Sequence, residues 1–427
     1  MKQTLQIHPD DNVLVALTDL PAGTALTANG QTLRSAEKIP VKHKVTLQAL
    51  APGDPVRMYG VLVGRATRPI PAGGLISTDN VEHATAAYAA RRARYEWAPP
   101  DISRWRGRTF QGYRRRDGRV GTANYWLVIP LVFCENRNVD VLRDALLEEL
   151  GYPRPRSFAV DTRRLVDRYR AGAGTAQLLE EDIVRSAEQL AARRVFPNVD
   201  GIKFLNHEGR CGGTRQDAQT LVRLLAGYID HPNVGGATVL SLGCQNAQIA
   251  LLEEALQARN PAFDKPLVIL EQQQSRSERA FIAEAVKRTF VGLIEANRCA
   301  RQPASLQHLS LGLECGGSDG FSGISANPAL GHASDLLVAL GGQAILSEFP
   351  ELNGVEQELL NRCADAATAR KFEQLMSAYA RQAEAAGSGF AFNPSPGNIR
   401  DGLITDAIKS AGAAKKGGAS PVTDVLD

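Results

Sequence analysis

Short apolar runs separated by turn residues occupy the first 83 residues of the chain. Residues 12–17 and 44–47 are rich in aliphatic and β-branched side chains, which is typical of strands. Pro-Ala-Gly or Ala-Pro-Gly turns at 21–23, 51–53 and 71–73 separate such runs, and Gly supplies the positive φ that these turns need. The pattern predicts a small all-β module over 1–83 and a basic linker, which contains a Pro-Pro pair, over 84–108.

From about residue 110 long apolar runs alternate with amphipathic stretches. Residues 125–133 are almost continuously apolar, as expected for a strand buried on both faces of a parallel sheet. Further strands are predicted at 201–205, 237–242, 266–270, 309–313 and 344–346, and helices at 138–150, 175–194, 214–229, 246–258, 275–296, 333–340, 354–362 and 366–385. Alternating strands and helices predict a largely parallel α/β fold. We expect it in two parts, 109–300 and 301–427.

Charge and composition exclude several classes of partner. Lys plus Arg is 49 and Asp plus Glu is 46, a formal net charge of +3, whereas nucleic-acid binders carry a strongly basic face. No window approaches about 18 consecutive apolar residues, and the first residues lack an apolar signal core, so we expect no membrane partner and no signal peptide. Six scattered Cys favour free thiols and a cytoplasmic protein.

Cysteines follow several predicted strands, at Cys134, Cys211, Cys244 and Cys315. Ligands of open α/β sheets bind beyond the carboxyl ends of the strands, where these residues could meet. Cys211, Cys244 and Cys315 stand in Gly-rich turns, and thiolates suit soft or borderline transition metals, so we expect these three to be metal ligands. The alternative at each position, and our expectation for Cys134, is a structural Cys. No CxxC pair supports a local metal site.

Acid/base chemistry has three candidate residues. His207 precedes Cys211 by four residues and is the first choice, because an imidazole titrates near neutral pH and can accept and return a proton. Glu348, after the last predicted strand, is the second, although it could equally cap a helix. His43 is the best polar candidate of the β module. For His43 and His207 the alternative is an ordinary surface or satisfied histidine.

Specific strings along the whole chain resemble the altronate/galactarate dehydratase family of bacterial sugar-acid dehydratases. They are Ile-His-x-x-Asp-Asn-Val at 7–13, Gly-x-x-x-Gly-Arg-Ala at 60–66, Tyr-Arg-Arg-x-Asp-Gly-x-Val-Gly at 113–121, His-Pro-Asn at 231–233, Gly-Cys-x-Asn at 243–246, Gln-Gln-Gln at 272–274, Leu-Glu-Cys-Gly-Gly-Ser-Asp-Gly at 313–320, Asn-Pro at 327–328 and Asn-Pro-Ser-Pro-Gly-Asn at 393–398. The resemblance implies an N-terminal SAF (β-clip) module and a larger parallel α/β catalytic region.

The resemblance also implies the reaction. It is the removal of water from an aldonate or aldarate, altronate first, to give a 2-keto-3-deoxy acid with the help of Fe²⁺ or Mn²⁺. In that reaction Ser318 and Asp319 would contact substrate hydroxyls. Asn393, Ser395 and Asn398 stand in a turn-rich string that predicts a rigid loop lining the pocket, the alternative being a simple tight turn. We expect a sugar acid as the small-molecule partner and a homo-oligomer.

Departures from the family pattern keep other functions open. A His-x-His-x-His-Asn string is replaced by residues 75–80, and the usual Gly-Cys-Glu is Gly243-Cys244-Gln245. The resemblance further implies a Gly/Thr-rich C-terminal family segment, which we expect to be absent here. The alternatives are a galactarate or related aldonate dehydratase, a sulfolactate-type sulfo-lyase, and a non-catalytic sugar-acid binding protein.

Overall fold

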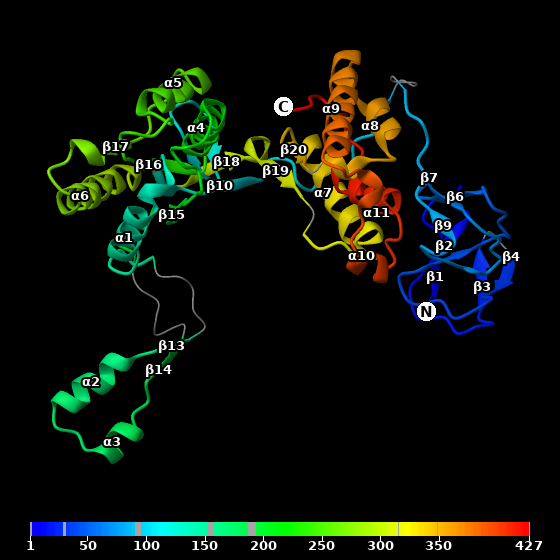
Figure 1. Ribbon diagram of the computed structural model, residues 1–427, viewed down its shortest axis with the longest axis horizontal. Coiled ribbons are helices and arrows are strands. Elements are labelled where there is room, and N and C mark those ends of the chain that lie inside the picture. Colours follow the sequence, from blue (N-terminus) through cyan, green and yellow to red (C-terminus); the bar gives the residue numbers. More distant parts are fainter. Residues whose placement is uncertain are drawn as a thin grey trace. The chain divides into compact units, whose positions relative to one another are not determined.

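The chain folds into two compact units, of which one is discontinuous in sequence. Residues 1–108 and 306–427 form unit 1, and residues 109–305 form unit 2. The computed structural model describes residues 2–28, 31–89, 95–152, 158–186, 194–314, 316–347 and 349–426. Figure 1 colours them along the sequence.

Unit 2 is built on a parallel sheet with strand order β15-β12-β16-β17. Its elements are β10 (Thr109–Arg114), β11 (Val120–Gly121), β12 (Tyr125–Pro130), α1 (Asn136–Leu147), β13 (Phe158–Val160), α2 (Thr162–Arg170), α3 (Thr175–Leu179), β14 (Val184–Ser186), β15 (Gly201–Phe204), α4 (Arg215–Asp230), β16 (Val234–Ser241), α5 (Ile249–Arg259), β17 (Leu267–Glu271), α6 (Glu278–Ala296) and β18 (Gln302–Ser305). This confirms the predicted α/β class.

Side chains alternate between the two faces of the sheet because successive residues of a strand point in opposite directions. Trp126 and Val128 of β12 pack with α1 and α6. Leu127 and Ile129 point to the opposite face and pack with α4 and α5. Figure 1 shows α4 and α5 on one side of the sheet and α1 and α6 on the other. Burial on both faces explains the continuous apolar run.

One predicted helix, over 175–194, is wrong at 184–186, and residues 187–193 lie outside the described residues. Helix α3 ends at Leu179, and Val184–Ser186 form strand β14, which pairs with β13 in an antiparallel hairpin. The β-branched pair Ile183-Val184 favours a strand over a helix. The predicted helix at 333–340 begins earlier, at Ala326, because Pro328 is tolerated in a first helical turn.

Unit 1 joins the β module to the C-terminal segment. The module contains β1 (Thr4–Leu5), β2 (Val13–Ala16), β3 (Ala25–Ala28), β4 (Gln31–Arg34), β5 (Lys44–Thr46), β6 (Pro55–Met58), β7 (Val61–Ala66), β8 (Leu75–Ile76) and β9 (Val81–Glu82). The C-terminal segment contains β19 (Ser310–Leu313), α7 (Ala326–Ala339), β20 (Gln343–Leu346), α8 (Glu356–Arg362), α9 (Ala366–Ala385), α10 (Pro396–Arg400) and α11 (Asp406–Ala414). β19 and β20 are parallel.

The module and the C-terminal segment share one hydrophobic core. Val56 and Val63 of the module are buried in the same cluster as Leu359, Ala407 and Ile408. Thr405 donates a buried hydrogen bond from Oγ1 to the carbonyl oxygen of Val63, at 2.8 Å. Figure 1 shows α11 next to the blue module. The module is therefore one side of a composite structure rather than a free-standing domain.

The segment predicted as a linker is docked on this unit where the structure describes it. The Ala89 amide donates to Oε1 of Gln357 at 3.3 Å, and the Tyr95 hydroxyl donates to the carbonyl oxygen of Ala419 at 2.5 Å. Tyr88 packs against the shared core.

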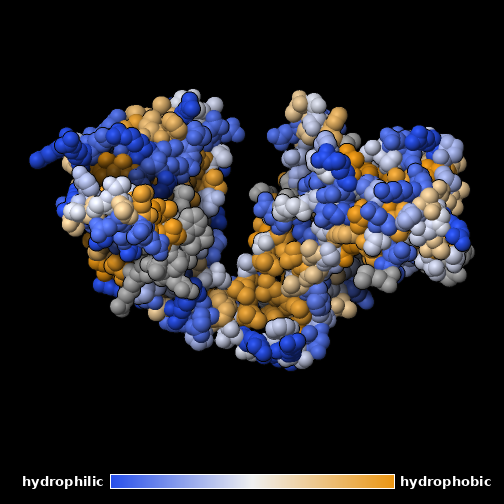
Figure 2. Space-filling model, turned by 90° about the horizontal axis from the view of Figure 1, so that it is seen from below, coloured by the Kyte–Doolittle hydropathy of each residue, from blue (hydrophilic) through white to orange (hydrophobic). Residues whose placement is uncertain are grey.

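Apolar residues are not confined to the core. Figure 2 shows that they gather in patches on the face it draws. Leu330 and Ile345 are exposed apolar side chains of unit 1.

Trp126 at the centre of unit 2 gives a test of the packing. Its indole Nε1 donates to Oγ1 of Thr238 at 3.0 Å, and a Cβ at Gly292 on α6 would overlap the ring. We predict that Gly292→Ala lowers the free energy of unfolding by about 1–3 kcal/mol through overpacking. The measurement is urea unfolding of the full chain followed by circular dichroism.

Gly227→Ala on α4 is the matched control. The nearest atoms to its added Cβ belong to Arg259, at 3.8 Å. This helical substitution should be neutral or stabilising by up to about 1 kcal/mol. Equal effects of the two alanines would contradict the packing described for Trp126.

Candidate active site

The turn before β5 packs closely against the C-terminal segment. Lys42 has a φ of 71°, in the left-handed region that non-Gly residues rarely occupy. Gly320 and Gly402 of the C-terminal segment pack against Lys42. A Cβ at Gly320 would lie 2.7 Å from Cβ of Lys42, and one at Gly402 would overlap the Lys42 carbonyl oxygen. Glycine is therefore required at both positions for the turn to dock.

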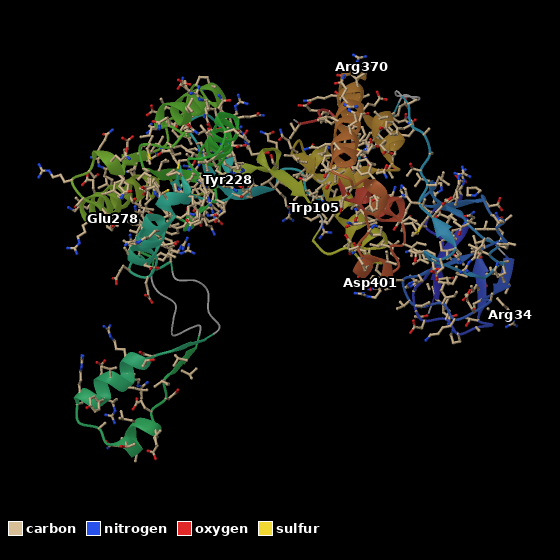
Figure 3. The ribbon with its side chains drawn as sticks, in the orientation of Figure 1. Arg34, Trp105, Tyr228, Glu278, Arg370 and Asp401 are labelled. Carbon is tan, nitrogen blue, oxygen red and sulfur yellow. The ribbon has the colours of Figure 1, made fainter. Side chains whose placement is uncertain are left out.

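The Lys42 ammonium lies between two carboxylates of the C-terminal segment. Its Nζ is 3.2 Å from Oδ2 of Asp319 and 3.4 Å from Oδ1 of Asp401. Figure 3 labels Asp401, directly after α10. Desolvation opposes the charge on Lys42, but the two aspartates outweigh it and raise the pKa of this lysine. Lys42 is therefore a fixed cation.

Asp319 is held as a carboxylate by its own loop. Its Oδ1 accepts from the amides of Phe321 at 2.7 Å and Ser322 at 2.9 Å. Desolvation would raise the pKa of Asp319, but these hydrogen bonds and Lys42 lower it. Both Asp319 and Asp401 keep substantial solvent exposure, so oxygen atoms of each remain open to a ligand.

The loops that carry Ser318 and Asn398 are joined to each other. Asn398 donates from Nδ2 to the carbonyl oxygen of Ser318 at 3.0 Å. Ser395 caps α10 by accepting from the Asn398 amide at 3.3 Å. The structure thus brings Ser318, Asp319 and Asn398, three predicted substrate-binding residues, to the cluster around Lys42.

Asn393, from the same Asn-Pro-Ser-Pro-Gly-Asn string, belongs to a separate, partly buried polar group. Lys409 donates to its Oδ1 at 3.1 Å and to Oε1 of Glu351 at 2.6 Å. Close by in sequence, Asp406 accepts from Nδ2 of Asn353 at 2.8 Å, and burial raises its pKa to about 7. A buried carboxylic acid that titrates near neutrality is suited to hold or transfer a proton.

His43 follows Lys42 and is half-buried. Its Nδ1 lies 3.2 Å from the carbonyl oxygen of Val41. A carbonyl only accepts, so Nδ1 carries the proton and Nε2 presents a lone pair. Nε2 has no hydrogen-bond partner among the described residues. This tautomer leaves His43 able to act as a base.

His207 lies in unit 2 and, unlike His43, has a hydrogen-bond partner at each ring nitrogen. Its Nδ1 accepts from the Gly209 amide at 3.0 Å, and its Nε2 lies 2.8 Å from the Pro130 carbonyl oxygen, to which it donates. Both ring nitrogens are thus engaged by the backbone. The ring joins the ends of β12 and β15 through these two contacts, and its predicted acid/base role stays a prediction.

Cys211 and Cys244 stand in adjoining loops at the carboxyl edge of the unit 2 sheet, and both are exposed. Asn246, beside Cys244, donates from Nδ2 to the carbonyl oxygens of Cys211 at 3.3 Å and Gly213 at 3.2 Å. Cys134 is also exposed, and the Phe133 amide donates to the Gly209 carbonyl oxygen at 2.7 Å. Loops after three strands therefore interlock, as the topology predicts.

The predicted metal set is only partly within the described residues. Within the part of the chain that is described, no three His, Cys, Asp or Glu side chains are placed to hold a metal ion. Cys315 and Glu348 lie outside the described residues. Their roles, and the role of Cys211 and Cys244 as ligands, stay predictions.

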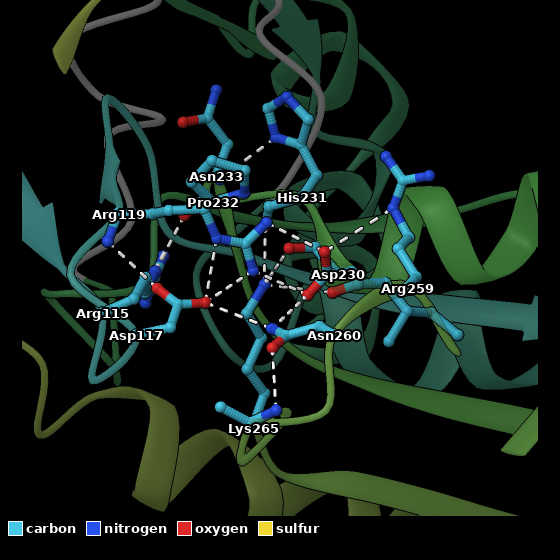
Figure 4. A network of polar contacts seen from close by, with 12 residues as sticks. Arg115, Asp117, Arg119, Asp230, His231, Pro232, Asn233, Arg259, Asn260 and Lys265 are labelled. Atoms are coloured by element: carbon cyan, nitrogen blue, oxygen red, sulfur yellow. Dashed lines mark hydrogen bonds and ion pairs between the residues drawn. The ribbon is translucent and has the colours of Figure 1, made fainter. Parts of the chain in front are cut away.

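Several strings of the sequence pattern stabilise the fold instead of forming a site. Arg119 donates to Asp230 at 2.6 Å and to Asp117 at 2.9 Å, and the Thr122 amide donates to Oδ1 of Asn233 at 2.7 Å. Figure 4 shows this network with its further members, Arg115, His231, Pro232, Arg259, Asn260 and Lys265. It lies where α4 ends and β16 begins, at the edge of the sheet opposite to Cys134, Cys211 and Cys244.

Sequence reasoning missed Lys42 and Asp401. A lysine in a turn and an aspartate after a short helix both have the appearance of solvated surface residues, and only their meeting across the shared core distinguishes them. The one available signal was proximity, since Lys42 precedes His43 and Asp401 follows Asn398 by three residues.

Three family models match consecutive parts of the chain. Residues 2–84 match the altronate/galactarate dehydratase SAF domain, residues 112–297 the second domain of D-galactarate dehydratase/altronate hydrolase, and residues 306–427 the D-galactarate/altronate dehydratase C-terminal domain. The chain belongs to the altronate/galactarate dehydratase family. Members are sugar-acid dehydratases, so the protein is an enzyme of the hydro-lyase class.

Named relatives in this family cover the whole chain. It is 32% identical to an altronate dehydratase of Bacillus subtilis (strain 168), over 100% of this chain and 76% of that protein. It is 31% identical to an altronate dehydratase of Escherichia coli (strain K12), over 99% and 76%. It is 28% identical to the L-threo-forming galactarate dehydratase of Escherichia coli (strain K12), over 99% and 73%. None of the described helices is long and apolar enough to cross a membrane.

Proposed function

We propose that the chain dehydrates altronate, and that the reaction takes place at the cluster of Lys42, His43, Asp319, Asn398 and Asp401. The main observation in support of this site is that the Lys42 ammonium lies between Asp319 and Asp401, where the β module meets the C-terminal segment. Similarity of 31–32% to two altronate dehydratases favours this sugar acid over galactarate.

Each group of the cluster suits one part of a sugar acid. A fixed ammonium is complementary to the substrate carboxylate. The carboxylates of Asp319 and Asp401 accept hydrogen bonds from sugar hydroxyls, which donate. The loops held by Asn398 and Ser395 keep these acceptors in place, so the substrate binds in one orientation.

In the proposed reaction Nε2 of His43 removes the proton from C2, next to the carboxylate. The electron pair of the C–H bond then forms the enediolate, which Lys42 stabilises as its negative charge increases. The C3–O bond breaks as the His43 imidazolium returns the proton to the leaving hydroxyl, which departs as water. The resulting enol tautomerises to the 2-keto-3-deoxy acid.

Iron or manganese, implied by the resemblance, enters no step of this proposal. Such an ion would supply Lewis-acid help to the leaving hydroxyl, but the described residues do not form a centre for it. A dependence on Fe²⁺ or Mn²⁺ stays a prediction, as do a homo-oligomeric state and a cytoplasmic location.

The reaction is tested by offering the purified protein altronate, galactarate and sulfolactate, each with Fe²⁺, with Mn²⁺ and with a chelator. We expect a 2-keto acid from altronate, formed with the highest kcat/KM of the three, because substrate discrimination is a ratio of kcat/KM values. Sulfite release from sulfolactate would instead indicate a sulfo-lyase. Binding without product from any of the three would indicate a non-catalytic protein.

The choice of base is tested by His43→Gln. Loss of a general base should lower kcat by about 10²-fold or more, while the melting temperature remains close to that of the wild type. The matched variant is His207→Gln, which should keep most of kcat and lower the melting temperature, because it removes contacts to Pro130 and Gly209. The reverse outcome would return the catalytic role to His207.

A further inference from the structure

Lys44, two residues after Lys42, is a lysine buried in the junction between the module and the C-terminal segment. Only 1% of it is exposed. Among the described residues no carboxylate pairs with its ammonium. Burial alone lowers its pKa to about 7. Burying an amine without a counter-ion is costly, so its hydrogen bonds must offset part of that cost.

Both hydrogen-bond acceptors of Lys44 belong to the candidate active site. Its Nζ donates to the carbonyl oxygen of Lys42 at 3.1 Å and to that of Gly402. The first acceptor is the residue in the left-handed conformation, and the second follows Asp401 directly. One amine therefore joins the turn that carries Lys42 to the loop that carries one of the two carboxylate partners of Lys42.

The left-handed backbone of Lys42 needs such a restraint. A non-Gly residue in this region costs roughly 1–3 kcal/mol and persists only where its surroundings over-determine it. Contacts with Gly320 and Gly402 limit the space around the turn, and the Lys44 ammonium holds the Lys42 carbonyl oxygen by a hydrogen bond. A glycine would avoid the strain but would carry no ammonium.

We propose that Lys44 is a positioning residue, which fixes the left-handed turn at Lys42 and so directs the Lys42 ammonium between Asp319 and Asp401. The inference rests on the proposed function for its effect on catalysis, but not for its effect on the conformation of Lys42. Lys44 itself does not touch the substrate, because it is buried behind the turn.

The test compares Lys44→Met with wild type in two independent measurements. The first is the rate of reductive methylation at Lys42, followed by mass spectrometry, which needs no substrate. Without Lys44, the Lys42 amine should leave its carboxylates and its labelling should rise severalfold. The second is kinetics on altronate, where kcat/KM should fall by roughly 10- to 100-fold, since a displacement of about 1 Å at a reacting group costs this much.

Lys416→Met is the control, because Lys416 is also buried in unit 1 at 3% exposure, and none of the hydrogen bonds or ion pairs between described residues joins it to the Lys42 turn. It should leave Lys42 labelling and kcat/KM, per folded molecule, close to wild type. Lys42→Met should match the kinetic loss of Lys44→Met, and the double variant should be no worse, since residues that act as one unit are not additive.

The outcomes separate the inference from the proposed function. Faster labelling of Lys42 with unchanged kcat/KM would support the positioning role and contradict the proposed site. Unchanged labelling of Lys42 in Lys44→Met would overturn the inference whatever the kinetics. If Lys44→Met does not fold, Lys44→Gln is measured in the same way, since it keeps N–H donors on a shorter side chain. The labelling rate of Lys42 in that variant then decides the inference.

Discussion

The candidate active site depends on the shared core that seals the β module to the C-terminal segment. Without Val56 and Val63 buried against Ala407 and Ile408, the turn before β5 would be an ordinary exposed loop. Burial brings the Gly402 carbonyl within reach of Lys44 and places the Lys42 ammonium beside Asp319. Hydrophobic burial thus provides a rigid frame, and a few polar contacts inside that frame define the chemistry.

The same core explains why the site cannot be recognised from the order of residues along the chain. The module and the C-terminal segment are separated by unit 2 along the sequence, yet Lys42 and Asp401 are ion-pair partners. Periodicity located the strands and most helices, because apolar runs and turn residues are local properties. It could not locate Lys42 or Asp401, because their significance lies in a contact between positions 359 residues apart.

Sequence alone was also unable to rank the histidines. His43 and His207 are the same type of residue, and proximity to Cys211 favoured His207. Hydrogen-bond geometry distinguishes them: the backbone engages both nitrogens of His207, whereas one nitrogen of His43 has no partner among the described residues. Specific strings such as His-Pro-Asn and Tyr-Arg-Arg-x-Asp-Gly were similarly ambiguous, since the structure assigns Asp117 and Asn233 to the network at the amino edge of the sheet.

The central claim, that the substrate binds where the module meets the C-terminal segment, is tested most directly by a crystal structure of the His43→Gln protein with altronate bound. The account predicts electron density for the sugar acid with its carboxylate within hydrogen-bond distance, about 2.7–3.2 Å, of Lys42 and its hydroxyls on Asp319 and Asp401. Altronate bound instead at the loops of Cys211 and Cys244, with the Lys42 turn empty, would contradict it.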